Sequence, residues 1–279
     1  MARSRLDAEL VRRGLVPSRN QAQRLVEEGR VLVNGMPAAK AASQIDQAVP
    51  IEVTKPAEKS DYVSRGAHKL LGALEAFHGE FPSIEGAKCL DAGASTGGFT
   101  DVLLQKGARE VVAVDVGYGQ LAWKLREDPR VTVLERVNIR HLTPEQVGTP
   151  PSLVVADLSF ISLTLVLPNL VTVAPGATMM LMVKPQFEAG KGKVGAGGVV
   201  RDPEIRAQTV LKVADRAIEL GLRVIGVAAS PLPGPSGNVE YFLLLAPRPV
   251  ENDQAIGLAG AELADRVRRA VAEGPQDGL

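Results

Sequence analysis

The architecture of most of the chain follows from one stretch, Cys89-Leu-Asp91-Ala-Gly93-Ala-Ser95-Thr96-Gly97-Gly98-Phe99-Thr100. An apolar strand ends in an acid, a glycine-rich turn follows, and a helix then begins. Glycines let the backbone come close to a ligand at the carboxyl end of a strand. Dinucleotide sites use the spacing G-x-G-x-x-G, whereas this turn reads Asp-x-Gly-x-x-x-Gly-Gly. The stretch predicts a nucleotide-like ligand on a strand–turn–helix unit that is not a dinucleotide site.

Strand-like and helix-like stretches alternate around this unit. We predict strands at 88–91, 111–115, 131–135, 153–157, 178–184, 222–229 and 239–245, and helices at 67–78, 100–106, 119–126, 163–170 and 204–220. Apolar strands separated by helices are typical of an α/β fold with a doubly wound, mostly parallel sheet. The last strand follows a loop rich in proline and glycine, so we expect it to pair antiparallel at the edge. A short helix at 261–272 has no predicted role.

The first 60 residues predict a separate, small α+β domain. Helices at 6–13 and 18–29 precede a strand at 31–33, a turn at Asn34-Gly35 and a closing strand at 49–53. This segment carries ten Lys and Arg against seven Asp and Glu, a net charge of +3, while the whole chain has a net charge of 0. A basic module on an acidic body is typical of an attached nucleic-acid-binding domain. We therefore divide the chain into domains at 1–60 and 67–279, with a linker at 61–66.

Composition excludes several classes of protein. No apolar run approaches the roughly 20 residues that cross a bilayer, and no apolar signal region follows the first charges. We therefore expect a soluble, cytoplasmic protein without a membrane span. The lone cysteine, Cys89, excludes an internal disulfide and lies in an apolar run, which predicts a buried structural thiol. The histidines His68, His78 and His141 form no ligand cluster, so we expect no metal.

Two polar residues after the next strands extend the ligand site. Asp115 ends the second strand, where a carboxylate accepts hydrogen bonds from ribose hydroxyls, although a lone acid there is also a common turn residue. Asn138 follows the third strand and suits an adenine edge, with the same alternative. Asp91 suits a cationic ligand, and S-adenosylmethionine carries an amino group and a sulfonium but no phosphate. We predict it as the cofactor, bound by Asp91, Gly93, Ser95, Thr96, Gly97, Gly98, Phe99, Thr100, Asp115, Val116, Gln120, Asn138 and Asp157.

Three charged residues lie at predicted strand ends or beside them. Asp157 and Lys184 close apolar strands, and Glu240 follows the loop at 231–238. The carboxyl ends of strands face the ligand crevice of a doubly wound sheet, so we expect these side chains to converge there. A buried lysine is costly without a carboxylate. A purely structural salt bridge among the three is the alternative.

The N-terminal pattern resembles the S4-type RNA-binding domain. The matching text is Arg5-Leu6-Asp7, Leu10-Val11, Gly14-Leu15, Ser18-Arg19, Ala22, Leu25-Val26, Gly29, Val31, Val33-Asn34-Gly35 and Lys40. The resemblance implies RNA binding, whereas isolated surface arginines are usually only solvated. We expect RNA contacts from Arg3, Arg5, Arg19, Lys40, Arg65, Lys191 and Lys193, the last two in a glycine-rich loop at 188–203 that otherwise serves as a connector.

The larger domain resembles the TlyA family of ribosomal-RNA ribose methyltransferases, which is similar to the FtsJ-type 2′-O-methyltransferases. The resemblance rests on the Asp91 turn and on residues 63–70, 115–121, 156–161, 183–187 and 234–240. It implies a Rossmann-like methyltransferase fold and a catalytic tetrad at Lys69, Asp157, Lys184 and Glu240. It further implies methyl transfer from S-adenosylmethionine to the ribose 2′-hydroxyl of cytidine in 16S or 23S ribosomal RNA, or in both.

These residues suggest roles within the tetrad. Lys184 acts on the attacking hydroxyl, either as a base or as a cation that stabilises the oxyanion. Asp157 and Glu240 orient the lysines, and Lys69 holds the target nucleotide or its phosphate. Two rival functions remain at this point: a nucleotide-dependent oxidoreductase, which lacks its G-x-G-x-x-G, and an RNA-binding protein with haemolytic activity, a label that some relatives carry. The oligomeric state stays open.

Overall fold

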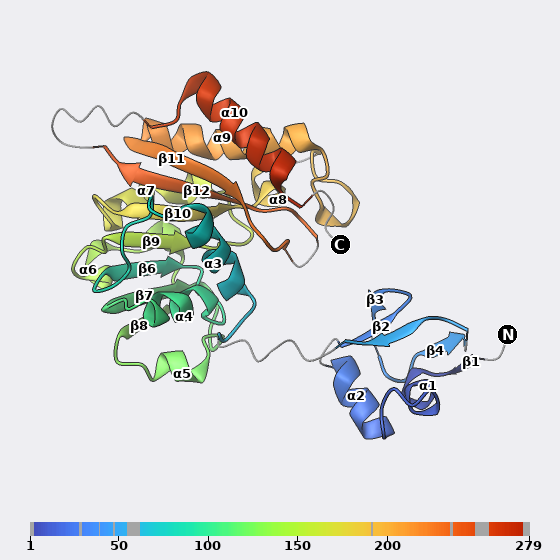
Figure 1. Ribbon diagram of the computed structural model, residues 1–279. Helices are drawn as coiled ribbons and strands as arrows, with labels where there is room; N and C mark the ends of the chain where they lie inside the picture. The colour runs from blue at the N-terminus through green and yellow to red at the C-terminus, as the bar shows by residue number, and fades with distance from the viewer. Residues whose placement is uncertain are drawn as a thin grey trace. The chain divides into compact units, whose positions relative to one another are not determined.

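The computed structural model describes residues 3–27, 30–38, 40–46, 48–54, 62–190, 192–234, 237–248 and 257–275. The chain divides into two compact units, Met1–Asp61 and Tyr62–Leu279 (Figure 1). Each unit has its own hydrophobic core.

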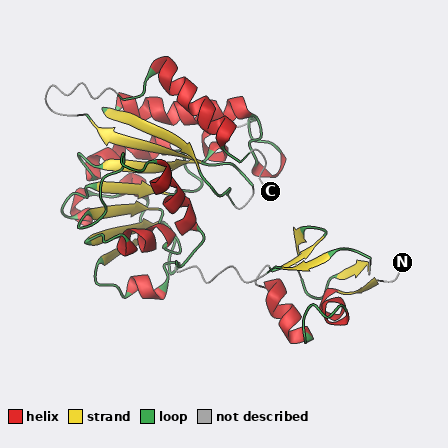
Figure 2. Ribbon diagram, in the orientation of Figure 1, coloured by secondary structure: helices red, strands yellow, loops and turns green. Residues whose placement is uncertain are grey.

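The N-terminal unit combines two helices with short strands (Figure 2). Helices α1 (Leu6–Arg12) and α2 (Arg19–Glu27) share a core with the sheet formed by β2 (Val31–Val33), β3 (Met36–Pro37) and β5 (Ile51–Val53). Strand β1 (Arg3–Arg5) pairs antiparallel with β4 (Gln44–Asp46). The predicted turn joins β2 to β3, with both Asn34 and Gly35 at positive φ, as a two-residue hairpin turn requires. The predicted α+β module is confirmed, with a closing strand shorter than expected.

The larger unit is built on a seven-stranded sheet in the order β11-β12-β10-β9-β6-β7-β8. Five strands are parallel: β6 (Lys88–Ala92), β7 (Glu110–Asp115), β8 (Val131–Glu135), β9 (Leu153–Ala156) and β10 (Thr178–Val183). They match the predicted strands to within a residue, and the mostly parallel α/β fold is confirmed.

The last strand corrects one expectation. Strand β12 (Tyr241–Pro247) is antiparallel, as predicted, but it lies between β10 and β11 (Leu222–Ala229), and β11 forms the edge. Tyr241 through Leu245 are all buried, whereas β11 alternates between buried and half-buried residues. An unbroken apolar run indicates a central strand, so this order was readable in the sequence.

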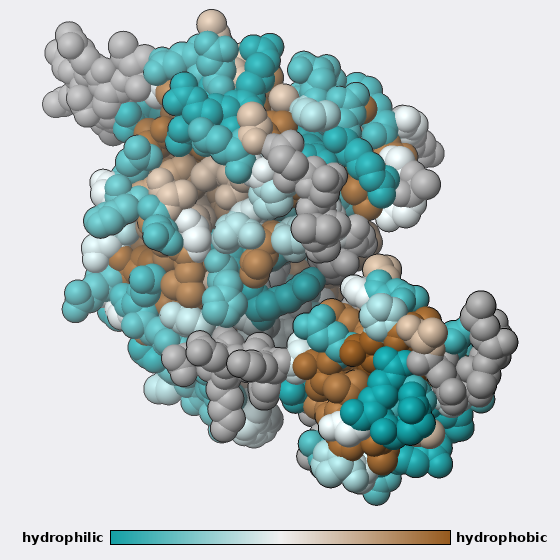
Figure 3. Space-filling model, turned by 45° about the vertical axis from the view of Figure 1, so that its right-hand side comes forward, coloured by the Kyte–Doolittle hydropathy of each residue, from teal (hydrophilic) through white to brown (hydrophobic). Residues whose placement is uncertain are grey.

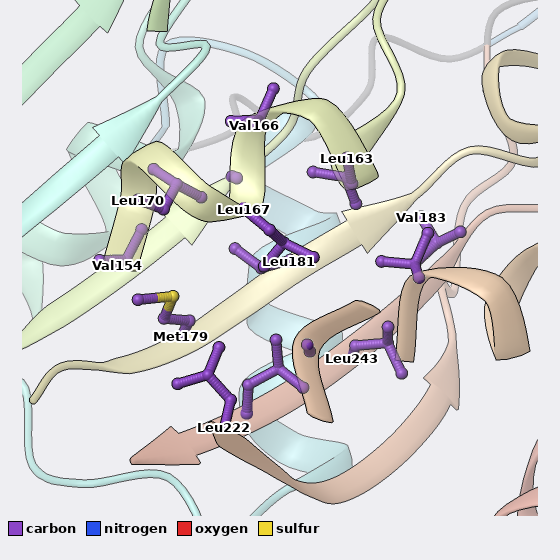
Figure 4. Packing of buried hydrophobic residues seen from close by; sticks show 14 of the residues in the cluster. Val154, Leu163, Val166, Leu167, Leu170, Met179, Leu181, Val183, Leu222 and Leu243 are labelled. Carbon is purple, nitrogen blue, oxygen red and sulfur yellow. The ribbon is translucent and has the colours of Figure 1, made fainter. Parts of the chain in front are cut away.

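Helices cover both faces of the sheet because strand side chains alternate between the faces. Cys89, Val111 and Ala113 face the layer of α3 (Gly66–Ala76), α4 (Gly98–Gln105) and α5 (Trp123–Arg126). Their neighbours Leu90, Val112 and Val114 belong to the core of the other layer, which includes α6 (Pro144–Val147), η1 (Ile139–His141), α7 (Leu163–Val173), α9 (Pro203–Glu219) and α10 (Gly260–Glu273). Figure 4 shows α7 side chains packed toward β9 and β10 in that core.

Two further expectations are revised. The helix predicted at 119–126 is only Trp123–Arg126, because Gly119 has a φ of 69° and the chain turns before Ala122. The predicted loop at 188–203 contains the last residue of α8 (Pro185–Glu188) and a short helix η2 (Ala196–Gly198). Cys89 is a buried free thiol, as predicted, and burial raises its pKa to about 12.

Candidate active site

The glycine turn between β6 and α4 lies against the end of β9. Gly93 has a φ of 90°, and a Cβ atom on it would lie 2.6 Å from the carbonyl oxygen of Asp157. A side chain there would be both strained and blocked, so the turn requires glycine at this position. This close approach brings the first and fourth parallel strands of the sequence to one rim.

A cavity of about 500 Å³ opens at this rim, at the carboxyl ends of β6, β7 and β9. Seven of the predicted cofactor residues line it: Gly93, Ser95, Asp115, Val116, Gln120, Asn138 and Asp157. Eight further residues complete the wall: Val114, Gly117, Val137, Ile139, Leu158, Ser159, Phe160 and Ile161. The cavity is therefore built where the glycine turn and the strand-end acids were expected to meet.

Asp115 organises the loops of this cavity. Its Oδ2 accepts a hydrogen bond from the backbone N–H of Ser95 at 2.8 Å, and its Oδ1 accepts one from Gly117 at 2.6 Å. A carboxylate has about four lone-pair sites, so two stay free for a ligand. Asp115 thus acts as a turn acid and lines the cavity as well.

Asn138 also has a local structural role. Its Oδ1 accepts from the backbone N–H of Arg140 at 3.0 Å and caps η1. The side-chain oxygen of Asn138 therefore has the role of a common turn residue, which was the alternative to adenine binding. Its position on the cavity wall leaves the amide nitrogen as the group for a ligand.

Three predicted cofactor residues lie behind the turn and line neither this cavity nor the one beside it. Gly97 packs toward Leu121 and Leu125. Asp91 is fully buried and accepts a hydrogen bond from Thr100 Oγ1 at 2.6 Å through Oδ2. Its Oδ1 is buried without a hydrogen-bond partner among the described residues. Burial raises the pKa of Asp91 to about 7, and the neighbouring charges of Asp157 and Asp115 add to the rise.

A second cavity of about 290 Å³ adjoins the first. Gly93, Ser95, Asp157 and Ser159 line both, so the two cavities share a wall. Three tetrad residues line the second cavity, namely Lys69, Asp157 and Lys184. Four other predicted site residues line it as well: Arg65, Thr96, Gly98 and Phe99. A ligand in one cavity would therefore reach a ligand in the other across Asp157 and Ser159.

The tetrad forms two ion pairs. Lys69 Nζ lies 2.5 Å from Glu240 Oε2, with side chains 6% and 1% exposed. Lys184 Nζ lies 2.5 Å from Asp157 Oδ1, and it donates a hydrogen bond to Ser159 Oγ at 3.0 Å. Glu240 thus pairs with Lys69 and not with Lys184. The alternative of one salt bridge among Asp157, Lys184 and Glu240 is therefore wrong. Only the family resemblance pointed to Lys69, which lies on the buried side of α3.

Sequence reasoning missed two residues of this rim. Ser159 follows the strand-end acid by two positions and lies in the stretch 156–161 that carries the family resemblance, but no role was assigned to it. Phe160 has a φ of 64° and is 90% exposed on the wall of the first cavity, and its ring lies 5.2 Å from that of Phe187. Nothing in the local sequence indicated this conformation.

Of the predicted RNA-binding residues that the structure describes, two bind a buried carboxylate and three are simply exposed on the surface. In the N-terminal unit, Arg5 and Arg19 both bind the buried carboxylate of Asp7, with shortest distances of 2.8 and 3.0 Å, and their side chains stay 45% and 56% exposed. Lys40, Arg65 and Lys193 are exposed. Lys191 and the side chain of Arg3 lie outside the described residues.

The neighbouring acid of α1 holds a second pair of arginines, which were not among the predicted RNA-binding residues. Glu9 is buried and accepts hydrogen bonds from both Arg12 and Arg13. These bonds, above all those from Arg12, lower the pKa of Glu9 to about 2. The N-terminal unit therefore presents arginines anchored on buried carboxylates.

The fold and the two joined cavities define a Rossmann-like methyltransferase domain that follows a small α+β module. Residues 62–246 match the family model described as FtsJ-like methyltransferase, and residues 4–47 match the S4 domain. The 16S/23S rRNA (cytidine-2′-O)-methyltransferase TlyA of Mycobacterium tuberculosis is 59% identical over 98% of this chain and 99% of its own length. The chain belongs to the TlyA family of FtsJ-like methyltransferases.

Two other relatives broaden this comparison. The 23S rRNA (cytidine-2′-O)-methyltransferase TlyA of Campylobacter jejuni is 33% identical over 81% of this chain and 92% of its own. A solved structure described as a hemolysin from Streptococcus thermophilus is 39% identical, covers 98% of this chain and 97% of its own, and has a TM-score of 0.72. The family therefore includes members whose names refer to two different activities.

Within the part of the chain that the structure describes, every helix is too short or too polar to cross a membrane. The amphipathic helix α10 buries its apolar residues Leu263, Val267, Ala270 and Val271 in the core of the larger unit. Figure 3 shows mainly hydrophilic residues on the outer surface over α9 and α10.

Proposed function

We propose that the chain transfers a methyl group from S-adenosylmethionine to the ribose 2′-hydroxyl of a cytidine in ribosomal RNA. One observation carries the proposal: the Lys184–Asp157 ion pair lies on the wall of the smaller cavity, and Asp157 also borders the larger one. The activity named for the Mycobacterium tuberculosis relative, at 59% identity over nearly the full chain, supports the same reaction.

The residues around the larger cavity fit the cofactor. A volume of about 500 Å³ falls within the usual range of small-molecule sites. Gly93 leaves no room for a side chain, so the backbone of the turn itself would face the methionine end of the ligand. The free lone pairs of Asp115 suit two ribose hydroxyls, and the exposed Val116 with Asn138 suits an adenine ring. Asp91, buried with one oxygen unpartnered among the described residues, supplies negative charge behind the turn.

Lys184 is the residue we assign to the attacking oxygen. S-adenosylmethionine supplies an electrophilic methyl group on a cationic sulfur. A ribose hydroxyl is a poor nucleophile, so the site must stabilise the charge that develops on its oxygen or take its proton. Lys184 carries the N–H groups for the first task, and Asp157 balances its charge. A charged Lys184 cannot accept the proton, which then leaves to water in the open second cavity; a neutral Lys184 would take the proton itself.

Lys69 and Glu240 are assigned to holding the target nucleotide. Lys69 borders the second cavity next to Arg65, so the two cations suit the phosphate beside the reacting ribose. Glu240 does not line that cavity and acts through Lys69. A nucleotide in structured RNA has to unstack and flip out of the helix to enter such a site. The S4 domain would keep the RNA bound during this step.

Both ribosomal subunits are the expected substrates. The Mycobacterium tuberculosis relative, whose name covers 16S and 23S RNA, matches 98% of this chain, whereas the Campylobacter jejuni relative, named for 23S RNA, matches 81%. A ribosomal substrate also implies a cytoplasmic location. Membrane lysis, the activity suggested by the haemolysin name, is less favoured because the apolar face of α10 is already buried.

The proposal is tested by incubating purified small and large ribosomal subunits with the protein and methyl-labelled S-adenosylmethionine. We expect label on the 2′-oxygen of a cytidine in each subunit, located by nuclease digestion and mass spectrometry, and only a small residual rate of labelling with Lys184→Ala. A liposome-leakage assay runs in parallel. Leakage without methylation would reject the proposed reaction in favour of the membrane activity.

A further inference from the structure

Ser159 lies at the junction of the two cavities and is exposed there. It follows Asp157 by two residues on the rim beyond β9, and its Oγ accepts a hydrogen bond from Lys184 Nζ at 3.0 Å. We propose that Ser159 is a positioning residue that directs the Lys184 ammonium toward the reacting ribose oxygen, an inference that rests on the proposed function.

The two partners of Lys184 differ in what they fix. Asp157 Oδ1 lies 2.5 Å from Nζ, yet this oxygen accepts no aligned hydrogen bond from the described residues. The contact is therefore a short ion pair without an aligned N–H group, so it constrains the separation of the two charges more than the direction of the N–H groups. The bond to Ser159 has the alignment of a hydrogen bond. Asp157 thus balances the charge of Lys184, and Ser159 sets the direction of its N–H groups.

Direction matters because of the chemistry of lysine. An ammonium carries three equivalent donors on a flexible stem and turns freely when only a charge holds it. With one donor aligned on Ser159 and the charge balanced by Asp157, the remaining donors keep a defined orientation at the cavity wall. Without the Ser159 oxygen, the N–H groups of Lys184 would lose this fixed orientation. Stabilisation of a developing oxyanion depends on donors that are already in place.

A structural role for this hydroxyl is disfavoured by its surroundings. Ser159 is exposed, so its removal leaves no buried group unsatisfied except one donor of Lys184 that water can reach. Ser159→Ala is therefore expected to fold normally. The effect should appear in the chemical step.

The test compares Ser159→Ala and Ser159→Thr with the parent full-length protein in methylation of purified ribosomal subunits. Ser152→Ala is the matched control, because Ser152 is an exposed serine at the other end of β9. Loss of one hydrogen bond to a charged group predicts that Ser159→Ala lowers kcat about 10- to 100-fold. KM for the subunit and Kd for S-adenosylmethionine should change less than about threefold. Ser159→Thr keeps the hydroxyl and should recover most of kcat.

A double-mutant cycle with Lys184→Ala separates positioning from an independent effect. In the Lys184→Ala background, Ser159→Ala should cause no further loss of rate. The proposal is overturned if Ser159→Ala keeps kcat within about twofold of the parent, if Ser159→Thr is as slow as Ser159→Ala, or if the two losses multiply. If the parent protein methylates neither subunit, the proposed function itself fails. If the parent is active and Ser159→Ala has a normal rate, only the role of Ser159 is rejected.

Discussion

At the scale of single residues, Asp91 is a carboxyl beside the site whose raised pKa lies near neutral pH. It is fully buried behind the glycine turn, and its pKa is raised to about 7, first by burial and then by the charges of Asp157 and Asp115. Those two acids line the larger cavity. A cation in the cavity would relieve the repulsion among the three carboxylates and favour the ionised form of Asp91.

This coupling predicts that S-adenosylmethionine binds more weakly as the pH falls below about 7, the raised pKa of Asp91. Below that pH the free protein holds the proton on Asp91, and binding the cation must release it, so Kd rises by up to about tenfold per pH unit. Above it, Asp91 is already ionised and its effect levels off. Calorimetric titrations between about pH 6 and 8.5 measure the trend. Asp91→Asn should retain only the titration of the ligand itself, and equal pH dependence in the two proteins would contradict the assignment.

The buried pair Lys69–Glu240 gives a second prediction, on stability. Both side chains are almost inaccessible, and Glu240 Oε1 already lacks a hydrogen-bond partner among the described residues. Lys69→Ala leaves the carboxylate uncompensated, which should lower the free energy of unfolding by about 3–5 kcal/mol. Urea denaturation measures the loss. The double variant Lys69→Met, Glu240→Leu should regain most of it while staying inactive, and a double variant as unstable as the single one would argue against a charge penalty.

At the scale of elements, the glycine turn ties β6 to β9. Gly93→Ala adds a Cβ atom that would meet the carbonyl oxygen of Asp157 at 2.6 Å, in addition to the strain of a positive φ. Strain alone costs about 1–2 kcal/mol. We expect a larger loss of stability and a Kd for S-adenosylmethionine that is weaker by about tenfold or more.

Gly176→Ala is the control for this turn. Gly176 also has a positive φ, but nothing lies within 4 Å of the added Cβ atom. Calorimetry and denaturation of both variants separate strain from obstruction. Equal effects in Gly93→Ala and Gly176→Ala would show that the close approach to Asp157 is unimportant.

Much of this architecture was predictable at the level of elements. Runs of apolar residues in the sequence predicted the strands of the sheet, because a central parallel strand is buried on both faces. The order of β11 and β12 was not predicted, since a loop rich in proline and glycine was interpreted as leading to an edge. Within the site, strand-end acids such as Asp115 were predictable from position, whereas Lys69 depends on an ion pair with a residue 171 positions away. Local sequence carries no signal for such a pair.

At the scale of the whole molecule, we expect the S4 domain to supply affinity for RNA and the methyltransferase domain to carry out the reaction. Arg5 and Arg19 share the buried Asp7 and remain about half exposed, so each has donors left for phosphates. Phosphate contacts give affinity that depends on salt and carry little of the chemical step.

The double variant Arg5→Gln, Arg19→Gln should therefore raise KM for ribosomal subunits by about tenfold or more and leave kcat within about twofold. The association constant for ribosomal subunits falls as the salt concentration rises. The steepness of this dependence on a log–log plot should decrease by about 1 for each phosphate that the protein no longer neutralises. Filter binding at several salt concentrations measures it. Arg216→Gln, at an exposed ion pair on α9, should behave like the parent. A fall in kcat with unchanged KM would contradict this division.

Because β12 is inserted antiparallel, we expect the site to be completed only after this strand has been synthesised. Tyr241 pairs with Val183, so the start of β12 meets the end of β10 and brings Glu240 to the same rim as Lys184. A parallel strand would have placed Glu240 at the opposite end of the sheet. A nascent chain that has not yet released residues 241–247 from the ribosomal exit tunnel has an open sheet and an unbalanced Lys69. Among the described strands β12 is the last in the sequence, so a product terminated before Glu240 would lack one member of the predicted tetrad, and we expect it to be inactive.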